Sequence, residues 1–175
     1  MFALDDQGEV IHQGEILMHD NAIKGISADE EFLFSVCANT AAAFHRISDF
    51  SEHAYSELAH ERISNACTTI DGGFASVGRD LKLRLWRAGK SEVFKTPHLH
   101  SVKCIAASPD RKLIATGSYG GTVALFDLET QRWVTQRKPT TSGISCITYS
   151  PETEAFIASS YDGHLYPCLL YTSDA

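Results

Sequence analysis

Short apolar runs separated by turn residues recur along the chain, and the clearest set lies at residues 102–127. Two mostly apolar runs flank a Ser-Pro-Asp-Arg turn, a Gly-Gly pair follows, and an alternating run closes the set. A more polar run then occupies residues 132–136. Runs of this length between turn residues predict four antiparallel strands joined by tight turns, with the inner strands more deeply buried than the outermost.

The same pattern repeats at a spacing of about 40 residues. His60 and Trp86 lie 40 residues before His100 and Phe126, and Ser118 recurs 42 residues later. A fixed period in this range, built from short strands, is typical of a propeller blade repeated around an axis. The chain is therefore predicted to be all-β, a partial propeller with three complete four-stranded blades flanked by two broken ones.

The register of the repeat predicts where each blade begins and ends. The expected parts are the last two strands of a broken blade (1–17), three blades (18–59, 60–98 and 99–139), a partial fourth blade (140–167) and a tail (168–175). The tail resembles a translated sequencing adapter, so we expect it not to be native sequence. Because propellers usually close with about four to eight blades, we expect a longer parent protein.

The repeat resembles the WD40 family, whose pattern runs from a histidine between blades to a Trp-Asp pair ending the third strand. The match is imperfect, since Gly78 stands where the family usually places a serine and Gly120 replaces its aspartate. We therefore expect no blade to hold the full His-Ser-Asp-Trp network, and the array to be softer than a consensus one. The residues that carry the resemblance are His19, His60, His100, Asp80, Trp86, Ser118, Phe126, Asp127, Ser160 and Asp162.

Composition narrows the function classes. The chain is 43% apolar, which excludes disorder, and its 15 basic against 22 acidic side chains argue against nucleic-acid binding. No apolar run reaches the length of a membrane span. Five scattered cysteines without a CxxC pair argue against disulfides and metal, and Cys104 and Cys146 suit equivalent buried positions. These features favour a reducing compartment, the cytoplasm or a eukaryotic nucleus.

The repeated histidines and the serines have simpler interpretations than catalysis. Repetition of the histidines at one blade position argues for structure, and neither Ser118 nor Ser160 lies in a Gly-x-Ser-x-Gly elbow. We predict no catalytic residue, no metal and no cofactor. The resemblance implies a noncatalytic protein-protein interaction scaffold within a larger protein. The alternative is a propeller enzyme with a cofactor or active site in the central channel.

In the WD40 family, the turn between second and third strands opens on the face most used for partners. By our register, Cys37, Arg79, Tyr119 and Tyr161 project there, and tyrosine and arginine are favoured at interface centres. The alternative that these tyrosines only pack on neighbouring loops stays open. Glu61, Arg62 and Ser101, just after the inter-blade histidines, should lie on the same face. The predicted partners are proteins or peptides, and the open apolar faces predict self-association.

Overall fold

All regular structure in the described part of the chain is β-strand. The structure is a computed structural model that describes residues 2–12, 14–87, 90–110 and 112–169. Within these ranges, seventeen strands form five antiparallel sheets. The all-β prediction is confirmed.

Three sheets have four strands in sequence order. Blade 1 comprises β3 (Ile23–Ala28), β4 (Phe32–Cys37), β5 (Ala42–Arg46) and β6 (Glu52–Ser56). Blade 2 comprises β7 (Ser64–Ile70), β8 (Gly73–Gly78), β9 (Lys82–Arg87) and β10 (Lys90–Lys95). Blade 3 comprises β11 (Val102–Ala107), β12 (Leu113–Ser118), β13 (Val123–Asp127) and β14 (Arg132–Arg137).

Two smaller sheets flank them. Blade 4 has three strands, β15 (Ile144–Ser150), β16 (Ala155–Ser160) and β17 (Leu165–Leu169), and a hairpin joins β1 (Phe2–Leu4) to β2 (Val10–His12). The two strands expected within 1–17 are therefore short, and residues 14–17 form no strand. Of the predicted tail, 168–169 end β17, whereas 170–175 lie outside the described residues.

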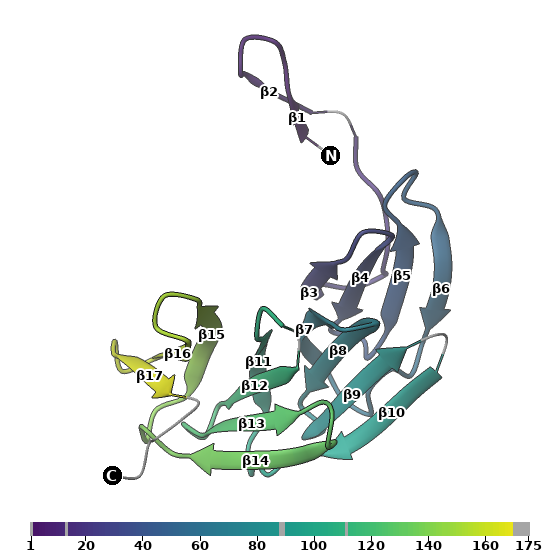
Figure 1. Cartoon of the computed structure of the whole chain (residues 1–175). Helices are drawn as coiled ribbons and strands as arrows, with labels where there is room; N and C mark the ends of the chain where they lie inside the picture. The colour runs from purple at the N-terminus through teal and green to yellow at the C-terminus, as the bar shows by residue number, and fades with distance from the viewer. Residues whose placement is uncertain (1, 13, 88–89, 111, 170–175) are drawn as a thin grey trace.

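The four blades stand side by side along an arc, with β3, β7, β11 and β15 on its concave side and the β1–β2 hairpin set apart (Figure 1). The innermost strands of successive blades contact one another. This is the predicted partial propeller, with three four-stranded blades between two smaller sheets.

The hydrophobic core lies between blades. Each blade presents one apolar face to the next, because alternate side chains of a strand point to opposite faces. The interface of blades 1 and 2 buries Phe34, Val36, Ala42 and Phe74; blades 2 and 3 bury Val77, Leu83, Ile114 and Phe126; blades 3 and 4 bury Ala115, Leu125, Ile144 and Phe156. Each blade is therefore stabilised mainly by its neighbours.

A β-bulge in the first strand recurs in all four blades and fixes their equivalence. The register shifts between Ile23 and Gly25 in blade 1, and at the same place in the other three. The first residue of each first strand pairs with Cys37, Gly78, Ser118 or Ser160. Residues that lie the same number of positions from these pairs along a strand are structurally equivalent.

Blade 2 holds the complete polar network that we expected no blade to hold. His60 Nδ1 lies 3.0 Å from the Asp80 carboxylate and Nε2 lies 2.9 Å from Ser76 Oγ. Trp86 Nε1 donates to the same Ser76 Oγ at 2.9 Å. The expectation was wrong because the serine stands two residues before Gly78. Since Nδ1–H donates to Asp80, Nε2 accepts from the Ser76 hydroxyl.

In blade 3, the structural histidine is His98 and the prediction of His100 was wrong. His98 Nδ1 lies 2.6 Å from Thr122 Oγ1 and Nε2 lies 2.9 Å from Thr116 Oγ1. Its side chain is 2% exposed, whereas His100 is exposed. The histidine lies 18 residues before its second-strand partner here and 16 before it in blade 2. The two additional residues displace the histidine from the strict 40-residue period.

The other blades keep parts of the signature. His19 Nε2 lies 2.8 Å from Ser35 Oγ in blade 1. In blade 4, Asp162 accepts hydrogen bonds from the Thr140 and Tyr166 hydroxyls, whereas the equivalent Asp80 of blade 2 accepts one from the inter-blade His60. The remaining signature residues have local roles: Ser118 bonds to Thr122, Asp127 accepts from the turn N–H groups of Glu129 and Thr130, and Phe126 and Ser160 are buried.

The cysteines are free thiols at five separate places. Cys104 and Cys146 occupy equivalent first-strand positions, as their bulge registers show. Cys104 is buried against blade 4, but Cys146 is exposed, which corrects the expectation that both are buried. Cys146 lies on the face of blade 4 that points away from blade 3.

Candidate protein-binding face

The turns between second and third strands lie at the same end of the blades as the loops between blades, because antiparallel strands reverse direction at each turn. We call this end the loop face. Arg79, Tyr119 and Tyr161 each donate a backbone N–H to the preceding inter-blade segment, at 2.8, 2.8 and 3.0 Å. Ala38 makes the equivalent bond in blade 1. Ala38 therefore takes the place predicted for Cys37, which is fully buried.

A pocket of about 330 Å³ opens on the loop face between blades 2 and 3. We call it the loop pocket. Four of the predicted partner-binding residues, Arg62, Arg79, Ser101 and Tyr119, line it, together with Leu81, Leu99 and His100. The structure thus brings together residues from two blades that the sequence placed on one face.

The two arginines carry the charge of the loop pocket. Both are exposed, and neither makes an ion pair with any residue that the structure describes. Glu61, which was also predicted to lie on this face, forms an ion pair with Lys82. Two guanidinium groups therefore face solvent on a chain whose net charge is −7.

Asp80 is close to the loop pocket but does not neutralise it. Burial raises the pKa of its carboxyl, yet hydrogen bonds from His60 and from the backbone N–H groups of Glu61 and Lys82 outweigh this and hold the pKa below its usual value. The carboxylate is committed to the blade 2 network, so its charge serves to anchor the inter-blade loop.

Two tyrosines extend the surface toward blade 4. The rings of Tyr119 and Tyr161 lie 6.0 Å apart, and the side chains remain 60% and 61% exposed. Tyr161 does not line the loop pocket but lies beside it. The tyrosines do contact one another, and they also leave most of their area free for a ligand.

Sequence reasoning missed Leu99 and His100 as pocket residues. Leu99 is 85% exposed, and an isolated leucine in a loop gives no pattern to recognise. His100 lies over Gly120, where an added Cβ would come within 2.5 Å of the imidazole Cδ2. Gly120, which stands where the WD40 pattern has an aspartate, therefore makes room for His100. Aligning the blades by their strand pairing would reveal this relation.

Ser101 is held by an inner strand. Asn65 Nδ2 donates to Ser101 Oγ at 3.0 Å and to the Val102 carbonyl at 2.6 Å. This contact links β7 of blade 2 to the start of β11 in blade 3. The inner edge of the loop pocket is therefore fixed by direct side-chain bonds between blades.

No group of three or more histidine, cysteine, aspartate or glutamate side chains in the described part of the chain is arranged to hold a metal ion. No helix long and apolar enough to cross a membrane occurs among the described residues.

The repeats match a known family. The model of the WD domain, G-beta repeat, matches residues 91–127 and 133–166, which include most of blades 3 and 4. These two segments are similar to WD40 repeats. WD40 repeats generally mediate protein-protein interactions and are typically noncatalytic.

Two computationally designed proteins share the fold. The Ika4 crystal structure superposes with a TM-score of 0.79 at 15% identity, covering 92% of this chain and 100% of Ika4. The Ika8 crystal structure gives 0.75 at 16% identity, covering 87% of this chain and 47% of Ika8. A comparison with curated protein sequences found no match. These likenesses establish the fold and carry no function.

Proposed function

We propose that this WD40 chain is a noncatalytic interaction module whose loop face binds a partner protein. One observation carries the proposal: the loop pocket joins Arg62 and Arg79 of blade 2 to Tyr119 of blade 3 around exposed leucine. Arginine and tyrosine dominate the energetic centres of protein interfaces, where they combine large contact area with charge-assisted hydrogen bonds.

The charge of the loop pocket favours an acidic segment of the partner. A carboxylate that enters it meets two guanidinium groups with no ion-pair partner among the described residues. Leu99 and Tyr119 supply apolar area beside this charge. The proposed ligand is therefore a protein segment with an acidic residue next to an apolar one.

The free thiols support a proposal for the compartment. All five cysteines are free, and Cys146 is exposed. We propose a reducing location, either the cytoplasm or a eukaryotic nucleus, where exposed thiols persist.

Affinity capture with matched variants tests the binding proposal. The chain is immobilised, exposed to lysate, and the bound proteins are quantified by mass spectrometry. Arg79→Ala with Tyr119→Ala should reduce recovery of the specific partner by about tenfold or more, since each hot-spot residue is worth more than about 1 kcal/mol. The control is Arg132→Ala, on exposed β14. If Arg132→Ala abolishes capture while the double variant retains it at unchanged melting temperature, the assigned face is wrong.

A further inference from the structure

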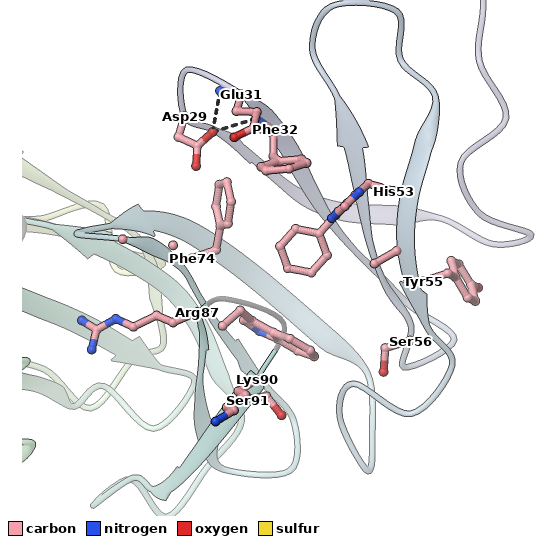
Figure 2. A pocket seen from close by; sticks show the side chains of 15 residues that line it. Asp29, Glu31, Phe32, His53, Tyr55, Ser56, Phe74, Arg87, Lys90 and Ser91 are labelled. Atoms are coloured by element: carbon pink, nitrogen blue, oxygen red, sulfur yellow. Dashed lines mark hydrogen bonds between the residues drawn. The ribbon is translucent and has the colours of Figure 1, made fainter.

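A larger pocket lies between blades 1 and 2, at the end opposite the loop face. We call it the rim pocket; its volume is about 740 Å³, within the range of ligand sites. Figure 2 shows Phe32 and His53 on its blade 1 side and Phe74 and Ser91 on its blade 2 side. The β3–β4 turn, the end of β9 and the start of β10 border it, so it is separate from the loop pocket.

The equivalent space between blades 2 and 3 is filled by two large aromatic side chains. Phe94 of β10 and Trp133 of β14 both pack on Phe126, each with ring centroids 5.0 Å away. Trp133 Nε1 also donates to the Lys95 carbonyl at 2.9 Å. Under this cover, Phe126 is fully buried.

Between blades 1 and 2, serines stand at both of these positions. Ser56 is equivalent to Phe94, because their strand partners Ala42 and Leu83 are equivalent. Ser91 is equivalent to Trp133, because their strand partners Trp86 and Phe126 are equivalent. Both serines line the rim pocket. The pocket therefore exists because two rings that close the next interface are absent from this one.

The missing rings leave aromatic surface uncovered. Trp86 occupies the position of Phe126 yet is only partly buried, and Phe44, 6.1 Å from it, is also only partly buried. Phe32 and His53 extend this surface, with ring centroids 4.8 Å apart. Such a surface favours another aromatic ring, because aromatic pairs gain contact energy beyond area burial.

The charges at the border of the rim pocket do not favour one sign of ligand. Asp29 accepts the N–H groups of Glu31 and Phe32, and Glu31 pairs with Arg46. Neither Asp29 nor Lys90 has an ion pair within the described ranges. The Arg87 guanidinium extends away from the pocket (Figure 2), because Arg87 and Trp86 point to opposite faces of β9. The aromatic surface therefore determines which ligand group fits.

We propose that the rim pocket binds an aromatic side chain from an extended segment of a partner protein. The ring takes the space that Phe94 and Trp133 fill one interface further along. The segment runs beside β6, which is the outermost strand of blade 1 and has one backbone edge without a strand partner in its sheet.

A defined peptide tests this site on the full chain. The probe is a fluorescein-labelled, capped peptide of sequence Ser-Gln-Trp-Ser-Phe-Gln-Ser, which lacks the carboxylate proposed for the loop pocket; its binding is measured by fluorescence anisotropy. Filling the pocket by Ser91→Trp, alone and with Ser56→Phe, should weaken binding by about tenfold or more, because the ring position is then occupied. The melting temperature should stay or rise, since the change copies the next interface. Arg132→Trp adds the same ring to an exposed strand position and should leave the affinity unchanged.

Several results would overturn the proposal. They are the absence of saturable binding up to about 1 mM peptide, equal binding of a peptide whose aromatic residues are replaced by serine, and unchanged affinity in Ser91→Trp. A change in sedimentation of Ser91→Trp without a change in peptide affinity would instead assign the rim pocket to a second copy of the chain. Arg79→Ala should leave peptide affinity unchanged, which separates this site from the loop pocket.

Discussion

Replacing Ser76 with alanine probes the polar network that distinguishes blade 2. The Ser76 hydroxyl is fully buried and joins His60 Nε2 to Trp86 Nε1, each at 2.9 Å. Its removal leaves two nitrogen atoms without their partner. Each unsatisfied buried group costs about 1–3 kcal/mol, so we expect Ser76→Ala to lower the free energy of unfolding by about 2–6 kcal/mol.

A matched change in blade 1 calibrates this value. Ser35 is structurally equivalent and equally buried, but its hydroxyl makes a single side-chain bond, to His19. Ser35→Ala should therefore cost about half as much, about 1–3 kcal/mol. Urea unfolding followed by circular dichroism measures both, with equal m-values required for the comparison. A loss for Ser76→Ala that is no larger than that for Ser35→Ala would refute the account of the network.

Three further outcomes are expected. Trp86→Ala should cost about 3–5 kcal/mol in urea unfolding, and Trp133→Ala clearly less, because Trp86 packs on Phe34 and donates to the buried Ser76 hydroxyl, whereas Trp133 lies in an outermost strand and donates to an exposed carbonyl; equal losses would contradict this. Burial lowers the pKa of His98 to about 4, below its usual 6.5. This histidine therefore adds stability that is complete above pH 6.5 and is lost as the pH falls toward 4, so His98→Gln should flatten the dependence of stability on pH in that window. Burial raises the pKa of the Cys104 thiol to about 12, so in maleimide labelling with mass spectrometry Cys146 should react at once and Cys104 only after unfolding; rapid labelling of Cys104 in the folded chain would show the opposite.

The blades could be predicted from sequence because strand patterns depend on local alternation and turn residues. The apolar runs, the Ser-Pro-Asp turn and the paired glycines of blade 3 are visible without any knowledge of neighbours. His98 could not be assigned this way, because a loop with two additional residues shifts the histidine while leaving the strands in register. Counting residues at a fixed period locates the strands, but it does not locate a loop residue when the loop length differs between blades.

The sites depend on contacts between blades, which lie far apart in sequence. Arg79 and Tyr119 were predictable as turn residues, since every blade repeats the same turn. The rim pocket was not predictable from sequence. It results from Ser56 and Ser91, which stand where the next interface has aromatic rings, and this equivalence is visible only from the pairing of two outer strands. Ser76 was missed for a related reason: its role depends on which face of β8 meets blade 1.

Hydroxyl-radical footprinting of the chain with its captured partner tests the central claim, that the loop face is the binding surface. Leu99, Tyr119 and Tyr161 are well exposed in the chain alone and should lose reactivity when the partner binds. Val93 and Val134, exposed on the outer strands β10 and β14, serve as internal controls and should keep theirs. Protection of the two valines, with unchanged reactivity of the leucine and the tyrosines, would contradict the claim.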